Sequence, residues 1–394
     1  MGEPLTGGPR PEPAVAPRPE PVEGPRPLPV DPLRVALVGC GNISTQYLAS
    51  LQRLPNLRLV SVTDPVAAAA DRVAAEHGVP ARSLDDALAD AGIDVILNLT
   101  PPQVHAPLTV RALESGKHVY LEKPFAVTAA EAETMVAAAA ASGRRIGSAP
   151  DTVLGTGIQT ARRLIDDGEI GQPIAATAFM MSPGHESWHP NPAFYYLRGG
   201  GPLLDMGVYY LTALVTLLGP IVAVSAMSSR LRTERLVPES GPRAGEVLPV
   251  EIDTYVAATL RHDSGAISTM IVSFDTIASR LPRIEVYGSE ASLDVPDPNQ
   301  FANPVGISRD RKEPFAYVSD LGGYPDAGRG YGLADMARAI SEGVPHRQSA
   351  ELGFHIHEVM ERIAEASETG TTVQVVSRCE RPAAVPQGAK PELA

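Results

Sequence analysis

The stretch that most constrains the fold is residues 33–44, Leu-Arg-Val-Ala-Leu-Val-Gly-Cys-Gly-Asn-Ile-Ser. A short apolar run, residues 35–38, ends at a pair of glycines, and a helical pattern begins at about Ile43. This order is typical of a buried parallel strand that leads into a helix. Gly39 supplies the unusual dihedrals of the turn, and Gly41 leaves no Cβ where a pyrophosphate would approach. The helix directs its unpaired N–H groups and its positive dipole end at that anion, so we expect a dinucleotide-binding turn.

Length and composition favour two domains and a tail. The 394 residues are 44% hydrophobic and 20% charged, which is ample material for two cores. The formal net charge of −13 argues against nucleic acid or an anionic membrane as the main partner, because both bind basic faces. No apolar stretch is long enough to cross a membrane, and no apolar segment of a signal peptide follows Met1. Cys40 and Cys379 lie far apart and give no disulfide framework, so we expect a cytoplasmic protein.

Proline density sets off both ends of the chain. Residues 1–31 are built from Pro-Arg-Pro-Glu-like units, which favour extended polyproline II and bury no core. We expect a disordered tail there, and the alternative is an arm that packs on a neighbouring subunit. Residues 380–394 are again rich in proline and polar residues, which predicts a loose C-terminal tail.

Between the tails, residues 32–150 alternate strand and helix patterns, which predicts an α/β domain with a doubly wound parallel sheet. The predicted strands are residues 33–38, 57–63, 94–99, 118–121 and 145–148, and the predicted helices are about 43–54, 66–77, 83–90, 104–115 and 128–142. A helix at 152–167 leads into a second domain, residues 151–379, of the α+β class with an open, mostly antiparallel sheet. Its predicted strands are residues 174–181, 221–228, 254–261, 267–274, 283–287 and 289–293, and its further helices are about 203–218, 330–342 and 350–368.

Asp64 ends the second predicted strand, twenty-three residues after Gly41. A carboxylate there accepts hydrogen bonds from the adenosine ribose hydroxyls and repels a 2′-phosphate. The residues that follow supply no arginine for such a phosphate, which favours NAD over NADP and leaves NADP possible. The alternative is that Asp64 only caps the next helix.

Thr100-Pro101-Pro102 stands at the carboxyl end of the third strand, where open α/β sheets bind ligands. A proline pair at a strand end can equally be a rigid turn. His105, in the first turn of the next helix, can reach a cofactor or simply cap that helix.

Glu122-Lys123-Pro124 follows the fourth predicted strand. A lysine at that edge can donate a hydrogen bond to a substrate hydroxyl or carbonyl, or lower the pKa of a neighbouring proton carrier. The alternative for Lys123 is an exposed side chain at a strand end.

Asp205 and Tyr209 lie four residues apart in the helix that opens after Gly199-Gly200-Gly201, and so on one helical face. A carboxylate and a phenol on one face make a substrate clamp and an acid–base pair. The alternative is that Asp205 favours the helix dipole and Tyr209 packs.

Residues 184–192, Gly-His-Glu-Ser-Trp-His-Pro-Asn-Pro, contain the single tryptophan and two histidines. A loop this rich in polar and aromatic groups suits a sugar-like ligand. His185 and His189 could bind a metal in principle, but no third ligand follows at a suitable spacing, so no metal site is expected.

Together these motifs resemble the Gfo/Idh/MocA family, named for glucose–fructose oxidoreductase and inositol dehydrogenase. The resemblance spans roughly residues 33–370 and rests on Gly39-Cys40-Gly41-Asn42-Ile43, Thr100-Pro101-Pro102 with His105, Gly116-Lys117-His118-Val119 running into Glu122-Lys123-Pro124, and residues 199–207. It implies an N-terminal Rossmann domain, a C-terminal open sheet that commonly makes oligomer contacts, and therefore a homo-oligomer, a dimer or tetramer. It also implies NAD(P)-dependent chemistry on sugar or cyclitol hydroxyls or ketones.

The resemblance assigns roles by position. Lys123 matches the lysine of the E-K-P motif and Asp205 the aspartate of the D-x-G-x-H motif, whose histidine position is Tyr209 here. Proton transfer then falls to Tyr209, with its pKa lowered by the Lys123 ammonium, or to Lys123 itself. Tyr210 lies about 100° around the helix and is the weaker candidate. The predicted cofactor contacts are Gly39, Gly41, Asn42, Ile43, Asp64, Thr100, Pro101, His105, Glu122 and Lys123, and the predicted substrate contacts are Asp151, His189 and Arg198.

The sequence thus predicts an NAD(P)-dependent dehydrogenase or ketoreductase that acts on a CH–OH group of a sugar, sugar derivative or cyclitol. Two alternatives stay open. One is an NAD-dependent enzyme that cleaves glycosides through transient redox chemistry, and the other is a non-catalytic, cofactor-sensing regulator.

Overall fold

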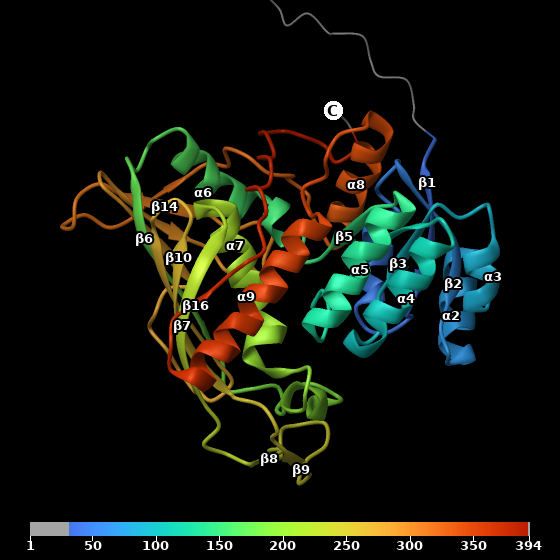
Figure 1. Cartoon of the computed structure of the whole chain (residues 1–394), viewed down its shortest axis with the longest axis horizontal. Helices are drawn as coiled ribbons and strands as arrows, with labels where there is room; N and C mark the ends of the chain where they lie inside the picture. The colour runs from blue at the N-terminus through green and yellow to red at the C-terminus, as the bar shows by residue number, and fades with distance from the viewer. Residues whose placement is uncertain (1–30, 393–394) are drawn as a thin grey trace, which may run out of the picture. The chain divides into compact units, whose positions relative to one another are not determined.

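The computed structural model describes residues 31–392 (Figure 1). The proline-rich tail lies outside the described residues except for Asp31, so its disorder stays a prediction. Across residues 31–392, no helix combines the length and the apolar character that crossing a membrane requires.

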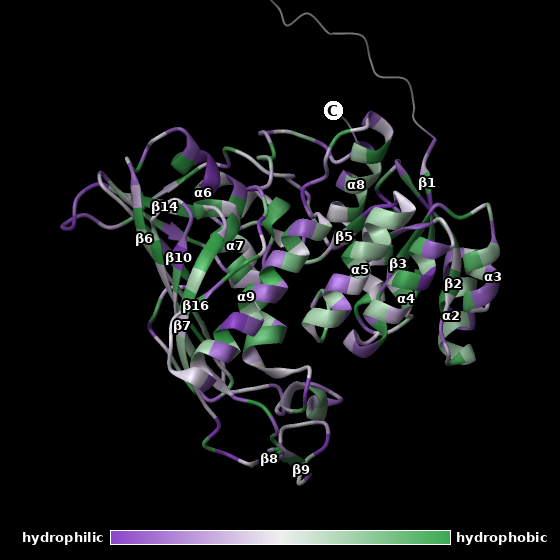
Figure 2. Ribbon diagram, in the orientation of Figure 1, coloured by the Kyte–Doolittle hydropathy of each residue, from purple (hydrophilic) through white to green (hydrophobic). Residues whose placement is uncertain are grey.

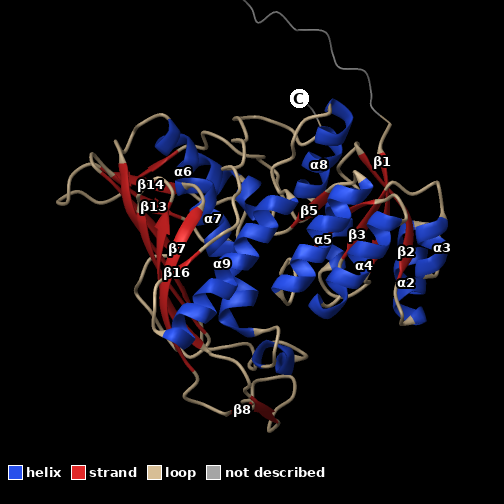
Figure 3. Ribbon diagram, viewed as in Figure 1, coloured by secondary structure: helices blue, strands red, loops and turns tan. Residues whose placement is uncertain are grey.

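The described chain begins with a five-stranded parallel sheet in the order β2-β1-β3-β4-β5 (Figure 3). Its strands are β1 (Leu33–Val38), β2 (Leu57–Thr63), β3 (Val95–Asn98), β4 (His118–Leu121) and β5 (Ile146–Ser148). The helices between them are α1 (Ser44–Leu51), α2 (Ala67–His77), α3 (Leu84–Ala89), α4 (Pro102–Glu114) and α5 (Ala129–Ser142). This is a Rossmann sheet, and the predicted doubly wound α/β fold is confirmed.

The strand order places the ends of β1, β3 and β4 along one edge of the sheet. β1 pairs in parallel with β3, so that Val38 faces Asn98, and β3 pairs with β4, so that Asn98 faces Leu121. All of β3 and β4 is buried, and the sheet is correspondingly apolar (Figure 2). The residues after these three strands therefore meet at the edge where parallel sheets bind ligands.

Helix α5 begins and ends where its sequence predicts. Thr128 accepts a hydrogen bond from the Glu131 amide, and the Glu131 carboxylate accepts one from the Thr128 amide, which is a complete capping box. Gly143 ends the helix at a φ of +64°, in the left-handed region that glycine adopts at lowest cost.

The second sheet in the described residues has nine strands in the order β15-β14-β13-β12-β6-β11-β10-β7-β16. They are β6 (Pro173–Met181), β7 (Ile221–Ser229), β10 (Tyr255–His262), β11 (Ile267–Ser273), β12 (Ile284–Gly288), β13 (Ser292–Val295), β14 (Val305–Ser308), β15 (Ala316–Val318) and β16 (Val373–Gln374). Neighbours are antiparallel except β6 and β11, so the predicted open, mostly antiparallel sheet is confirmed. The sequence did not predict the short strands β14, β15 and β16, nor the separate hairpin of β8 (Glu234–Leu236) and β9 (Val247–Pro249).

Helices α6 (Thr156–Asp166), α7 (Val208–Leu218) and α9 (Ala350–Thr369) share one hydrophobic core with the nine-stranded sheet (Figure 1). Every residue of α7 is buried, as its nearly unbroken apolar sequence requires. Helix α8 (Tyr331–Glu342) instead joins the core of the first sheet, where Leu333 and Met336 pack with Val35 and Leu37. The chain thus returns to the Rossmann domain after completing most of the second sheet.

Residues 380–392 are not a loose tail, which corrects the prediction from composition. Val385 is buried, its amide donates to the Gln159 side chain at 2.8 Å, and its carbonyl accepts from the Gly323 amide at 2.9 Å. Arg347 donates hydrogen bonds to the carbonyls of Ala383 and Ala384. Proline removes backbone donors but not acceptors, and these carbonyls are what hold the segment in place.

Candidate functional site

A cavity of about 660 Å³ lies at the carboxyl edge of the Rossmann sheet, where loops of both sheets meet. The residues that follow β1, β3 and β4 supply one side, namely Asn42, Ile43, Thr100, Glu122 and Lys123. The second domain supplies the other side, including His185, Trp188, His189, Tyr195, Asp205, Tyr209, Phe274, Arg283, Asn299 and Arg329. The cavity thus brings together the strand-end motifs and the Asp205–Tyr209 pair.

Lys123 and Asp205 form a partly buried ion pair in this cavity. The ammonium donates to Asp205 Oδ1 at 2.6 Å and to the Asp205 carbonyl at 2.8 Å. Burial alone would lower the pKa of Lys123, but the negative charge of Asp205, with smaller contributions from Tyr209 and Glu122, raises it above its ordinary value. Lys123 is therefore a fixed cation at neutral pH, which argues against Lys123 itself as the proton carrier.

The segment that carries Asp205 is a π-helical turn, η3 (Leu203–Gly207), and not the first turn of a regular α-helix. The predicted helix over residues 203–218 is therefore divided, and its α-helical part, α7, begins at Val208. A π-helical turn widens the backbone ring, so carbonyls near it can leave the helical hydrogen-bond ladder. Asp205 presents both its carbonyl and its carboxylate to Lys123 in this way.

Tyr209 lies beside this ion pair and is only 4% exposed. Its hydroxyl oxygen accepts a hydrogen bond from Arg329 Nη2 at 3.1 Å. The Lys123 ammonium and the Arg329 guanidinium lie over its ring, 5.3 and 5.2 Å from the centroid. Burial raises the pKa of Tyr209, and although Lys123 and Arg329 lower it, the net pKa stays above its usual value. The lowering expected from the Lys123 ammonium is present, but desolvation of the Tyr209 phenol outweighs both cations.

The turn after β1 has the shape that a dinucleotide requires. Gly39 has a φ of +103°, and a Cβ there would lie 2.6 Å from the Leu99 carbonyl oxygen. A Cβ at Gly41 would meet nothing within 4 Å, so the space above this residue is open to a ligand. Helix α1 follows this turn without a side-chain cap at its N-terminus, so the positive end of its dipole is available to an anion in that space. These features fit the pyrophosphate of NAD(P).

Asp64 stands next to this turn, but it does not line the cavity. Its Oδ2 accepts from the Cys40 amide at 2.8 Å and its Oδ1 from the Val66 amide at 2.8 Å. Asp64 therefore holds the glycine turn in shape, and each oxygen keeps a second lone pair for a ribose hydroxyl.

Replacing Asp64 by alanine is expected to weaken NAD binding about 10- to 100-fold, the usual loss for hydrogen bonds to a charged group. NADP binding should weaken less, because repulsion of its 2′-phosphate disappears, so the preference for NAD shrinks. Quenching of Trp188, which lines the cavity, measures both dissociation constants. Asp71→Ala on exposed α2 surface is the matched control, and an unchanged NAD/NADP ratio in Asp64→Ala would contradict the prediction.

The other predicted cofactor residues divide into two groups. Thr100 lines the cavity, and its hydroxyl donates to Asn98 at 2.6 Å, while Pro101 precedes α4. His105 is fully buried, with ring nitrogens 2.8 Å from the Pro124 carbonyl oxygen and 2.9 Å from that of Thr100. Its side chain thus joins the two turns and does not reach the cavity, which corrects its expected cofactor contact.

Glu122 lines the cavity, but both of its carboxylate oxygens are already engaged. Oε1 accepts from the Tyr47 hydroxyl at 2.7 Å and Oε2 from the Lys123 amide at 3.0 Å. Glu122 therefore anchors α1 and the start of the Lys123-Pro124 turn, whose peptide bond is cis.

The predicted substrate contacts are only partly brought together. His189 lines the cavity, with its ring edge-on to Tyr195 at 5.0 Å between centroids. Asp151 is completely buried behind the cavity, where it accepts hydrogen bonds from the amides of Gly330 and Gly332. Arg198 is exposed and outside the cavity lining. The expected contact of Asp151 is wrong, since the turn after Pro150 points inward. The expected contact of Arg198 stays a prediction.

The rings of His185, Trp188 and Tyr195 form an aromatic wall of the cavity, and the sequence did not predict that His185 in this wall faces Asp205. His185 stacks on Tyr195 with 3.8 Å between ring centroids, and it meets Phe274 edge-on at 4.6 Å. His185 Nε2 lies 3.5 Å from Asp205 Oδ2. Burial lowers the pKa of His185 to about 4, so the ring is neutral at pH 7. The loop 184–192 signalled a polar, aromatic surface, but nothing in its spacing paired His185 with Asp205.

The β8–β9 hairpin holds this wall in place through one buried arginine, Arg235. Its Nε donates to Glu186 at 2.6 Å, and its Nη1 donates to Asp275 at 2.6 Å. Glu186 also accepts from the Tyr196 hydroxyl. The loop that carries His185 is therefore fixed by an ion-pair network rather than by regular secondary structure.

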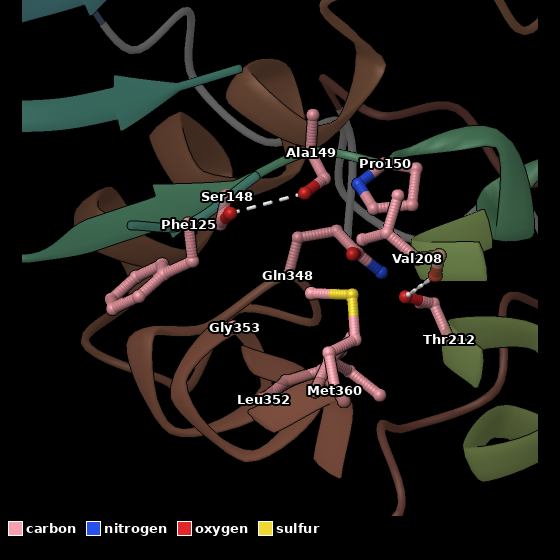
Figure 4. Close-up of a pocket in the computed structure, with 11 residues that line it drawn as sticks. Phe125, Ser148, Ala149, Pro150, Val208, Thr212, Gln348, Leu352, Gly353 and Met360 are labelled. Atoms are coloured by element: carbon pink, nitrogen blue, oxygen red, sulfur yellow. Dashed lines mark hydrogen bonds between the residues drawn. The ribbon is translucent and has the colours of Figure 1, made fainter. Parts of the chain in front are cut away.

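A second enclosed space lies between β5, α7 and α9, and Figure 4 shows the side chains that line it. Its volume of about 10 Å³ is close to that of a single water, so it cannot hold a substrate. Within residues 31–392, no cluster of three or more His, Cys, Asp or Glu side chains could hold a metal ion.

A Rossmann sheet with an open glycine turn, joined to a lysine–carboxylate–phenol cluster, defines the class of nicotinamide-dependent oxidoreductases. The chain belongs to the Gfo/Idh/MocA family. The model described as "Oxidoreductase family, NAD-binding Rossmann fold" matches residues 33–149, and that of the "GFO/IDH/MocA C-terminal domain" matches residues 158–294.

Individual relatives agree with this assignment. The chain is 28% identical over 275 residues to scyllo-inositol 2-dehydrogenase (NAD(+)) of Bacillus subtilis, covering 66% of this chain and 73% of the relative. It is 30% identical over 253 residues to D-glucoside 3-dehydrogenase of Escherichia coli, covering 62% and 70%. The crystal structure of an NAD binding oxidoreductase from Klebsiella pneumoniae superposes with a TM-score of 0.76 at 25% identity, covering 88% of this chain and 100% of the other.

Proposed function

We propose that this protein is an NAD-dependent dehydrogenase or ketoreductase for a hydroxyl or ketone carbon of a sugar, sugar derivative or cyclitol. The observation that carries the proposal is the meeting of Lys123, Asp205 and Tyr209 in one cavity beside the open glycine turn. The names of the inositol and glucoside relatives support the substrate class.

The glycine turn of Gly39 and Gly41, supported by Asp64, would hold NAD, and the cofactor would supply the hydride acceptor for oxidation of the substrate's carbinol carbon. The hydroxyl proton of the substrate passes to the Tyr209 oxygen in its phenolate form, so a ketone and protonated Tyr209 result. Lys123 holds its charge throughout and stabilises the negative charge that develops on the substrate oxygen. Asp205 positions the ammonium and accepts hydrogen bonds from neighbouring substrate hydroxyls. Reduction reverses each transfer, with Tyr209 as the acid.

The wall of His185, Trp188 and Tyr195 suits the apolar face of a pyranose or cyclitol ring. In such a pocket the aromatic side chains pack against the ring of the ligand, and a few polar groups fix its orientation so that one carbon can react. This favours a polyol over a small aliphatic alcohol.

A panel assay tests the proposed function directly. Purified protein is mixed with NAD or NADP and with aldoses, cyclitols and glycosides, and the absorbance of reduced nicotinamide is followed. Reduction with one class of polyol supports the proposal. Cofactor binding with sugar release but no net reduction would favour transient-redox glycoside cleavage, and cofactor binding without any turnover would favour a regulator.

We also propose that the protein is a homo-oligomer, a dimer or tetramer, formed through the open face of the nine-stranded sheet. Phe179, Ile271, Ala257 and Met227 are cross-strand neighbours on β6, β11, β10 and β7. They form an apolar row that is incompletely buried, with Met227 80% exposed. Light scattering after size exclusion should give at least twice the mass of one chain, 41.5 kDa, and a monomer would contradict the proposal.

A further inference from the structure

Arg329 is the one side chain that hydrogen-bonds the Tyr209 oxygen among the described residues. It stands in the loop before α8, 120 residues beyond Tyr209, and it lines the same cavity. Its Nη2 donates to the Tyr209 oxygen at 3.1 Å and to Asn299 Oδ1 at 2.8 Å. No sequence motif pointed to this residue.

The direction of that hydrogen bond decides where the Tyr209 proton points. A guanidinium carries donors and no acceptor, so the phenol oxygen must accept from Arg329. Within residues 31–392, the Tyr209 hydroxyl takes part in this hydrogen bond and donates none of its own. Its own hydrogen is therefore uncommitted, and it can point to a ligand in the cavity that Tyr209 lines.

The buried guanidinium of Arg329 makes no close hydrogen-bonded ion pair with a carboxylate in the described residues. Its Nε and Nη1 are buried without a hydrogen-bond partner in residues 31–392, and Nη1 lies 3.8 Å from Asp151 Oδ1. Asp151 instead accepts from the amides of Gly330 and Gly332, at 2.7 and 3.1 Å, so it fixes the backbone that carries Arg329. A buried guanidinium with so few acceptors costs stability, and its close contacts run through the single nitrogen that faces Tyr209.

We propose that Arg329 is a positioning residue that aims the Tyr209 proton into the cavity and stabilises the tyrosinate form by its charge. The inference rests on the proposed function, in which Tyr209 carries the proton. The titratable and charged groups around Tyr209 are Glu122, Lys123, Tyr195, Asp205 and Arg329. Of these, Lys123 is neutralised by Asp205, whereas Arg329 delivers its charge at the phenol oxygen.

The kinetic test compares Arg329→Met and Arg329→Lys with Arg283→Met. Arg283 lines the same cavity and pairs with Asp297, but it makes no contact with Tyr209, so it controls for loss of one positive charge. In Arg329→Met we expect kcat to fall about 10- to 100-fold with a much smaller change in KM. The rise of kcat/KM with pH in polyol oxidation should move about one to two pH units to the alkaline side. In Arg329→Lys the rise of kcat/KM should return most of the way to the pH at which it occurs in the parent protein. In Arg283→Met it should occur at the parental pH.

A second readout does not depend on turnover. A fluorinated tyrosine, whose phenol is more acidic than tyrosine's, is incorporated at position 209, and its ¹⁹F shift is titrated with pH. Its pKa should rise in Arg329→Met and not in Arg283→Met. If Arg329→Met does not fold, Arg329→Met combined with Asp151→Asn removes the stranded carboxylate and is titrated instead.

The outcomes separate the two proposals. A raised ¹⁹F pKa without turnover of any polyol would overturn the proposed function and leave the coupling of Arg329 to Tyr209 standing. Turnover with an unmoved pH profile and an unmoved ¹⁹F pKa in Arg329→Met would overturn the role of Arg329. Equal kcat in Arg329→Lys and Arg329→Met would likewise overturn the role of Arg329, since a positive charge at position 329 would then have no effect on turnover.

Discussion

Lys123→Ala is expected to lower kcat for polyol oxidation by about 1,000-fold, with little change in the dissociation constant of NAD. The ammonium is 2.6 Å from Asp205 Oδ1 and lies over the Tyr209 ring, so its removal takes away one of the two cations beside Tyr209 and leaves the Asp205 carboxylate unpaired. Asp205 borders the cavity and can hydrate, so the variant should fold. Steady-state kinetics and tryptophan quenching measure the two effects separately.

The matched control for Lys123→Ala is Lys117→Met, at the other end of β4. Lys117 is also buried, but its ammonium donates to the carbonyls of Asp90 and Ile93, away from the cavity. That variant should lose stability on heating while its folded fraction keeps the kcat of the parent. Near-parental turnover in Lys123→Ala would remove Lys123 from the proposed chemistry.

Tyr209→Phe is expected to lower kcat about 100- to 10,000-fold, the usual range for loss of a positioned acid–base group. The substitution removes one oxygen and leaves the ring under its two cations, so the pocket keeps its shape. Tyr210→Phe is the matched control, because Tyr210 is buried and does not line the cavity. Its kcat should stay within about twofold of the parent, as is usual away from a reacting centre.

The pH profile gives Tyr209→Phe a second signature. Because burial holds the pKa of Tyr209 above its usual value of about 10, the phenolate fraction rises with pH throughout the neutral range. Oxidation by the parent protein should therefore accelerate with pH up to strongly alkaline conditions, whereas reduction, which needs the protonated phenol, should stay level. Tyr209→Phe should lose the alkaline acceleration. A parental profile in that variant would assign the proton to another group.

Much of the fold and half of the site could be predicted from local patterns. The glycine turn, Lys123 and Asp205 each follow a strand or open a helix, and parallel pairing brings strand ends to one edge without further information. The remaining residues depend on contacts between distant parts of the chain. Arg329 lies in an irregular loop 120 residues from its partner, and no periodicity marks it.

The burial of individual side chains at the site could not be predicted from the sequence either. Asp151 stands at a strand end as a ligand-binding residue would, but it is turned inward toward the amides of Gly330 and Gly332. The pKa of Tyr209 depends on how much desolvation opposes two nearby cations, and only the packed structure gives that balance. Residues 380–392 are ordered for a related reason, since composition does not reveal that their carbonyls accept hydrogen bonds from Arg347 and from the Gly323 amide.

Because of the π-helical turn at residues 203–207, the direction of the Asp205 side chain does not follow the regular α-helical spacing of α7. Helix α7 is buried on every side and cannot rotate, so the direction of Tyr209 is set by the core. One residue more or fewer in a helix turns everything upstream by about 100°. A single-residue deletion in this turn would thus swing the carboxylate away from Lys123 while leaving the phenol where it is. In alignments with family members, gaps near the D-x-G-x-H motif therefore carry geometric meaning, and motif identity alone does not guarantee that the two side chains meet.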